Sequence, residues 1–177
     1  MTYAIAFCIE AVFFIFTATL FGSLYFAEKS GAPFFPTPKS AIRDAMRATA
    51  LTPSETFYDL GAGTGKVLII AEKEFGAHAI GFEISIIFCC IAKINILFHL
   101  SHARLFAKNL FGQNLSNADV VFCFLFPPIM QKIENKLKAE LKPGARVIVY
   151  AFPLPTMTPK KITTVRGKWK MFFYTMQ

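Results

Sequence analysis

A glycine-rich turn between two apolar segments constrains the fold of this chain more than any other feature. Residues 59–65 read Asp-Leu-Gly-Ala-Gly-Thr-Gly and follow a short strand-like run. An apolar helical pattern occupies residues 67–75, and residues 77–82 form a second strand-like run that ends at Glu83. Strand, glycine turn, helix and strand in this order predict a nucleotide-binding β-α-β unit. Glu83 lies about 20 residues beyond the first glycine, where a carboxylate can accept hydrogen bonds from ribose hydroxyls.

The residues around the turn separate three kinds of cofactor. A triphosphate-binding loop needs glycine where Leu60 stands and a hydroxyl where Val67 stands. A dinucleotide fingerprint needs a third glycine where Lys66 stands. The remaining pattern, Asp-x-Gly-x-Gly-x-Gly, resembles motif I of the class I, or seven-β-strand, S-adenosylmethionine-dependent methyltransferases. A glycine turn without any ligand is disfavoured, because strand, helix, second strand and acid all follow in order.

The N-terminal segment is unusually apolar. Hydrophobic residues make up 54% of the 177-residue chain and charged residues only 17%, and residues 5–27 contain Glu10 as their single charge. About 20 apolar residues suffice to cross a bilayer. No basic segment precedes this stretch, which favours an uncleaved anchor over a signal peptide. We therefore expect residues 1–28 to form one transmembrane helix.

The distribution of basic residues predicts orientation and partners. Lys29, Lys39, Arg43 and Arg47 follow the expected span, so the rest of the chain should lie on the cytoplasmic side, or on the equivalent side in an organelle. A net charge of +8 suits an anionic lipid surface. It would also suit RNA, but the sequence has no aromatic-basic RNA-binding motif, and nucleic acid is not favoured. The cysteines and histidines lack metal-ligand spacing, so we expect no metal site.

The remaining chain divides into two parts. Residues 29–53 are expected to hold a linker, a Pro-Thr lid and the helix that leads into the domain. Residues 54–177 alternate helices with five strand patterns, which indicates a parallel sheet covered on both faces. A hairpin is expected at residues 162–174, and the short segment before it leaves little room for a helix. The predicted fold class is therefore α/β, a minimal Rossmann-like seven-strand methyltransferase sheet preceded by one transmembrane helix.

Taken together, these features resemble one family, the protein-lysine methyltransferases that include the enzymes for the ATP synthase c-subunit and adenine nucleotide translocase, with small archaeal relatives. The resemblance covers most of the chain after residue 32. It implies transfer of methyl groups from S-adenosylmethionine to lysine side chains of a protein, most often a membrane protein. It rests on residues 33–37, 59–65, 83, 109–111, 124–127 and 143–147.

The resemblance also assigns cofactor-binding residues by position. They follow the first three strands and comprise Asp59, Gly61, Ala62, Gly63, Gly65, Glu83, Asn109 and Leu110. The glycines and Asp59 would hold the methionine and ribose side, and Glu83 the ribose hydroxyls. The family usually has Asp where Asn109 stands. An amide oxygen can still accept a hydrogen bond from the adenine amino group, so binding remains feasible.

The methyl-transfer pocket is expected at two places. Phe124 and Phe126 follow the fourth strand and would face the transferring methyl, while Phe35, Pro36 and Thr37 would form the lid. Methyltransferases that act on nucleobase amines place Asn or Asp before Pro-Pro-aromatic at the first of these places. Here a phenylalanine precedes the two prolines and isoleucine follows them, which counts against base methylation. The sequence identifies no general base.

Two other functions fit parts of the pattern. A small-molecule methyltransferase acting on a lipid or quinone at the membrane would explain the apolar exit of the fourth strand. A non-catalytic assembly factor that retains the fold would explain Asn109 and the short C-terminal half.

Overall fold

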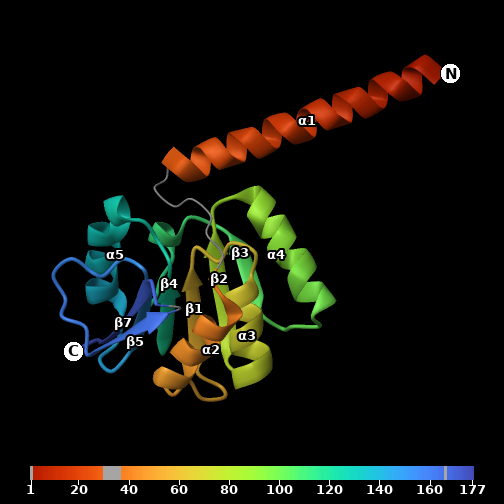
Figure 1. Cartoon of the computed structure of the whole chain (residues 1–177). Helices are drawn as coiled ribbons and strands as arrows, with labels where there is room; N and C mark the ends of the chain where they lie inside the picture. Colours follow the sequence, from red (N-terminus) through yellow and green to blue (C-terminus); the bar gives the residue numbers. More distant parts are fainter. Residues whose placement is uncertain (1, 30–36, 166) are drawn as a thin grey trace.

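The fold is an α/β sandwich built on one seven-stranded sheet (Figure 1). The computed structural model describes residues 2–29, 37–165 and 167–177. Strand order is β3-β2-β1-β4-β5-β7-β6. The first five strands pair in parallel, and β7 pairs antiparallel with both β5 and β6. The strands are β1 (Thr56–Leu60), β2 (His78–Glu83), β3 (Arg104–Ala107), β4 (Val120–Cys123), β5 (Arg146–Tyr150), β6 (Lys161–Val165) and β7 (Trp169–Thr175).

The helices are α1 (Thr2–Lys29), α2 (Lys39–Ala48), α3 (Lys66–Phe75), α4 (Ile86–Phe98) and α5 (Pro127–Glu140), with a short 3₁₀ helix η1 (Leu110–Gly112). From α3 to α5 the helices lie between successive strands, as the alternating pattern predicts, and α1 and α2 precede β1. No helix forms in residues 151–160, before the β6–β7 hairpin. The predicted α/β seven-strand methyltransferase sheet is confirmed.

One strand is shorter than its apolar run suggests. Residues 119–126 are apolar after the first, yet β4 ends at Cys123. The chain must leave the sheet there, because Pro127 and Pro128 occupy the first turn of α5, where proline is tolerated. Residues 124–126 are thus released from strand pairing and lie at the carboxyl end of β4.

The sheet is buried on both faces, which explains its nearly continuous apolar strands. On one face, Ile42 and Met46 of α2 pack with Phe57 and Phe122. On the other, Ile133 and Leu137 of α5 pack with residues that include Leu60, Val121 and Val147. We call these two sides the α2 face and the α5 face.

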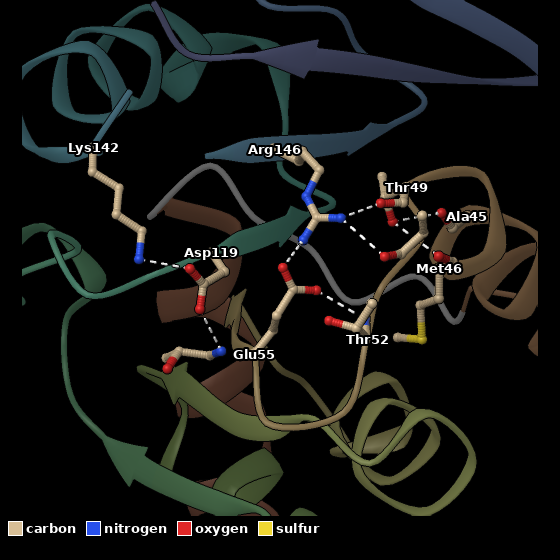
Figure 2. Close-up of polar contacts among 10 residues, drawn as sticks. Ala45, Met46, Thr49, Thr52, Glu55, Asp119, Lys142 and Arg146 are labelled. Carbon is tan, nitrogen blue, oxygen red and sulfur yellow. Dashed lines mark hydrogen bonds and ion pairs between the residues drawn. The ribbon is translucent and has the colours of Figure 1, made fainter. Parts of the chain in front are cut away.

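A polar network fixes α2 at the amino end of the sheet (Figure 2). The guanidinium of Arg146, at the start of β5, donates to the carbonyl oxygens of Thr49 and Ala50 and pairs with Glu55. These carbonyls follow the last turn of α2, where orphan acceptors need partners. The C-terminus of α2 is therefore held at the amino end of β5, and the helix begins towards the carboxyl end, next to Thr37.

The prediction of a membrane anchor is wrong. Crossing the hydrocarbon core of a bilayer takes about 20 predominantly apolar residues in one helix. In the part of the chain that the structure describes, no helix meets both the length and the apolarity that a span requires. This finding overturns the transmembrane helix expected at residues 1–28 and, with it, the single-pass membrane localisation with a cytoplasmic or organellar catalytic side.

Candidate functional site

The glycine turn lies at the carboxyl ends of β1 and β2. Gly61, Gly63 and Gly65 have φ values of +85°, +52° and +75°, a region that glycine enters without steric penalty. The amides of Gly61 and Ala62 both donate to the carbonyl oxygen of Phe82, at 3.0 Å each. The turn is thereby tied to β2, with Gly61 exposed and Ala62, Gly63 and Gly65 buried, and it lies where a ligand across the two strand ends would contact it.

Glu83 connects the turn to the end of β2. One carboxylate oxygen accepts from the amide of Gly63 at 2.8 Å, and the other accepts from the amide of Ser85 at 2.8 Å. The side chain is buried. A carboxylate has about four acceptor positions, so these two bonds fix its orientation and leave further positions for hydroxyl donors.

Asp59 is a buried acid of the site whose hydrogen-bonding capacity is not fully used. Its side chain is buried, and within the described residues its Oδ2 has no hydrogen-bond partner. Burial raises the pKa of the Asp59 carboxyl to about 8, and the nearby negative charge of Glu83 contributes in the same direction. A buried polar atom without a partner is rare in folded proteins. The site therefore suits a cationic or hydrogen-bond-donating ligand, as a sulfonium cofactor with an amino group would be.

Helix α4 supports the turn from outside. The side-chain amide of Asn95 donates to the carbonyl oxygen of Thr64 at 3.0 Å. A Cβ on Gly65 would lie 3.1 Å from the Cβ of Ala92, so the helix approaches the turn closely. Sequence reasoning did not assign Asn95 to the site. Its one signal was that Asn95, with Lys93, interrupts an otherwise apolar helix.

Asn109 and Leu110 lie at the same end of the sheet, after β3. Asn109 is exposed, and its Oδ1 accepts from the amide of Phe111 at 3.0 Å, which caps the 3₁₀ helix η1. One lone pair of this oxygen is thus in use and one remains. Leu110 packs against the α5-face core. Their contact with adenine stays a prediction.

The two aromatic residues at the exit of β4 do not form a single surface. Phe124 packs against the α2-face core, and its ring lies 4.8 Å from that of Tyr150 in a T-shaped pair. Phe126 instead lies 5.4 Å from the ring of Phe152, which packs against the α5-face core. The alternation between the two faces continues past β4 through Phe124 and Leu125 and ends at Phe126, the N-cap residue of α5. Phe124 and Tyr150 therefore belong to the α2 face, whereas Phe126 lies against Phe152 of the α5 face.

The predicted lid is described only at its last residue. Phe35 and Pro36 lie outside the described residues. Thr37 is buried, immediately before α2. Since α2 begins towards the carboxyl end of the sheet, Thr37 lies at the end of the molecule that carries the glycine turn. A role for these residues as a lid stays a prediction.

Comparison with known proteins supports one family. The sequence profile of the ANTKMT methyltransferase domain matches residues 59–161. A protein-lysine N-methyltransferase of Saccharolobus islandicus is 32% identical over 136 residues, which cover 75% of this chain and 84% of that protein. The lysine N-methyltransferase of the ATP synthase c-subunit from Mus musculus is 30% identical over 146 residues, 81% of this chain and 58% of the mouse protein. The chain thus spans little more than half the length of this mammalian relative.

A solved structure shows the same fold with a cofactor product in place. The crystal structure of an RNA methyltransferase from Salinibacter ruber, in complex with S-adenosyl-L-homocysteine, superposes with a TM-score of 0.77 at 26% identity. The match covers 80% of this chain and 94% of the Salinibacter protein. The buried Asp59, the acceptor positions of Glu83 and the left-handed glycine turn fit a cofactor of this chemistry, and the profile match covers more than half of the chain. The chain therefore belongs to the ANTKMT methyltransferase domain family, its cofactor is S-adenosylmethionine, and the resemblance to the protein-lysine methyltransferases is confirmed.

Proposed function

We propose that this chain is a protein-lysine N-methyltransferase. The observation that carries the proposal is an apolar aromatic pair, Phe124 and Tyr150, beside the strand that ends in the glycine turn. The half-buried ring of Phe124, backed by the buried Tyr150, suits the long aliphatic stem of a lysine. Two of the relatives are named for the same activity, on unspecified protein and on the ATP synthase c-subunit.

The cofactor would be held by the turn and the acids around it. The glycine turn, in which Gly61 is exposed, would contact the methionine and ribose parts, and the free acceptor positions of Glu83 suit ribose hydroxyls. The remaining lone pair of Asn109 Oδ1 suits the adenine amino group. When bound, the sulfonium supplies an activated methyl group whose transfer forms a carbon–nitrogen bond as the carbon–sulfur bond breaks.

The part of Phe124 and Tyr150 in the reaction is to prepare and align the amine. A lysine must lose its proton before it can attack, and an apolar environment penalises the ammonium and lowers the lysine pKa. The proton leaves to solvent before the amine is enclosed. Phe124 and Tyr150 would then restrict the side chain to an approach in line with the methyl group, which is the main requirement for a displacement on a reactive electrophile. No side chain is assigned as a general base.

The substrate is proposed to be a membrane protein. Support comes from relatives named for the ATP synthase c-subunit and for adenine nucleotide translocase. The adenine nucleotide translocase lysine N-methyltransferase of Mus musculus is 35% identical over 107 residues.

RNA is the second candidate substrate. The Salinibacter neighbour is an RNA methyltransferase, and the net charge of +8 would favour a polyanion. Against it, the residue before Pro127 and Pro128 is Phe126, which cannot hydrogen-bond a planar amine.

Both candidates can be tested in one experiment. The purified chain is incubated with S-adenosylmethionine labelled in its methyl group and with a total extract, which is then separated into protein, lipid and RNA. We expect label in protein, recovered as methylated lysine after acid hydrolysis. The Glu83→Ala variant should abolish it, whereas Glu74→Gln, on the outer surface of α3 and paired with Arg43, should not. Label confined to RNA or lipid would overturn the proposal.

A further inference from the structure

Three aromatic rings cross the carboxyl end of the sheet on neighbouring strands. Phe124 follows β4, Tyr150 ends β5, and Trp169 begins β7. The rings of Phe124 and Tyr150 are 4.8 Å apart, and those of Tyr150 and Trp169 are 6.2 Å apart. We call these residues the aromatic row. Because β4 lies next to β1 in the strand order, the row runs outward from the glycine turn.

All three rings belong to the α2 face. Phe124 and Tyr150 pack in or against the core on that side. Trp169 pairs across the hairpin with Val165, which packs against the same core, and directly paired residues point to the same face. The row therefore extends the Phe124–Tyr150 pair that the proposed function uses.

Exposure differs along the row. Trp169 is 37% exposed, Tyr150 is 2% exposed and Phe124 is half-buried. The face of an indole is the best aromatic partner for a cation that is still partly hydrated. The two less exposed rings beyond it give an apolar environment that penalises the charge and favours the neutral amine. The row thus offers a charged group a more favourable site at Trp169 than beside Tyr150 and Phe124.

The structure already places a lysine on the outer ring. The amino group of Lys168 lies 5.8 Å from the centroid of the Trp169 ring, within the range of a cation–π contact. The indole thus already accepts an ammonium group of the chain itself, and a substrate lysine would displace Lys168 or use the opposite face of the ring.

The backbone beside the row is strained. Ala151, directly after Tyr150, has a φ of +72°, which is unusual for a residue with a side chain. Its amide donates to the carbonyl oxygen of Lys170 at 2.8 Å. This bond attaches the strained residue to β7 next to Trp169. Strain of this kind persists where surrounding structure enforces it, and it concentrates at functional sites.

We infer that Trp169 is a specificity-determining residue of the lysine methyltransferase, and this inference rests on the proposed function. Its indole captures the ammonium group of the substrate lysine at the outer end of the aromatic row. The side chain then reaches the half-buried ring of Phe124, which the buried Tyr150 supports, and there the amine is neutral and faces the methyl donor. Trp169 selects a charged lysine over a neutral side chain of equal length.

Fluorescence can test capture without turnover, because Trp169 is the single tryptophan of the chain. The protein, saturated with S-adenosylhomocysteine, is titrated at constant ionic strength with Nα-acetyl-lysine methylamide and with the norleucine equivalent. We expect a saturable change in emission with the lysine compound and a much smaller one with norleucine. Equal responses, or none with lysine, would overturn the inference.

Kinetics supply the second test. Methyl-lysine formation is measured at increasing concentrations of extract protein for wild type, Trp169→Leu and Trp169→Phe. We expect Trp169→Leu to raise the apparent KM about 3- to 30-fold, the range a cation–π contact supports, with kcat and cofactor affinity nearly unchanged. Trp169→Phe should fall between it and wild type.

Ile162→Ala is the matched control. Ile162 is exposed on the same hairpin, but it pairs with Phe172, which packs in the α5-face core. Its KM should stay at the wild-type value. An active wild type with an unchanged KM in Trp169→Leu would overturn this inference alone. A wild type that forms no methyl-lysine would overturn the proposed function and this inference together.

Discussion

At the scale of single residues, Asp59 links the stability of the fold to pH. Its pKa of about 8 lies well above the ordinary value of 3.8, mainly because the carboxyl is buried. Between these two values the folded protein holds a proton that the unfolded chain has released. The contribution of Asp59 to stability is therefore full below pH 4 and is lost as the pH rises towards 8.

The Asp59→Asn variant should remove this dependence. Without cofactor, the free energy of unfolding of the wild type should fall relative to the variant by up to about 1.4 kcal/mol per pH unit between about pH 4 and 8. Urea unfolding at about pH 5, 6.5 and 8 measures the difference across this window. If wild type and variant show the same slope with pH, Asp59 does not titrate there.

Gly81 makes a second prediction at this scale. A Cβ at this position would lie 2.5 Å from Cδ1 of Leu68 and 2.8 Å from Cβ of Ala62, in the turn itself. Gly81→Ala should therefore destabilise the protein by about 1–3 kcal/mol, the usual effect of overpacking, and weaken cofactor binding. Gly112→Ala is its control, since nothing among the described residues lies within 4 Å of a Cβ there. Chemical denaturation and cofactor titration would report both effects, and equal stability of the two variants would contradict the prediction.

The residues that sequence could identify are those whose spacing is local. Asp59, the glycines and Glu83 follow from one strand-turn-helix-strand unit. Asn95 and Trp169 could not be identified, because their relation to the site depends on how α4 and the hairpin pack. The orientation of Phe126 away from Phe124 was also out of reach, since the apolar run gave no sign that the alternation ends at Phe126.

At the scale of elements, one side chain of β5 holds the C-terminal end of α2. Arg146 binds two carbonyls after the last turn of α2 and the carboxylate of Glu55 (Figure 2). A second ion pair at this end of the sheet joins Asp119 to Lys142 at 2.6 Å. The order of strands and helices was predictable from periodicity, but this docking was not, because its partners are far apart in sequence.

Replacing Arg146 should loosen α2. Arg146→Met leaves Glu55 and two carbonyls without their partner, and we expect a loss of about 2–4 kcal/mol in the free energy of unfolding. Arg47→Met is the comparison, since the 3.4 Å contact of Arg47 with Asp44 is exposed and should contribute less than about 1 kcal/mol. Thermal or urea unfolding would rank the two, and a similar small loss in both would contradict the role given to Arg146.

At the scale of the whole molecule, cofactor binding should stabilise the entire fold. The glycine turn, Glu83 and α4 are joined by hydrogen bonds, so a ligand at the turn contacts several elements together. At about 100 times its Kd, S-adenosylhomocysteine should add about 2.7 kcal/mol to the free energy of unfolding. For a domain of this size that corresponds to a Tm increase of about 5–10 °C.

Differential scanning fluorimetry measures this shift. NAD⁺ should leave the Tm unchanged, because Lys66 stands where a dinucleotide site needs glycine. The Glu83→Ala variant should respond much less to S-adenosylhomocysteine than the wild type does. A wild type without any shift would favour the assembly factor over the enzyme.

The contact between Arg146 and α2 also has a consequence for synthesis on the ribosome. Arg146 is 97 positions after Thr49, whose carbonyl it binds. At about 5–20 residues per second of translation, α2 emerges roughly 5–20 s before Arg146. During that interval Ile42 and Met46 can meet Phe57 of β1 but not Phe122 of β4, and the carbonyl of Thr49 lacks its guanidinium partner. The apolar face of α2 is therefore only partly covered until β4 and β5 have been made.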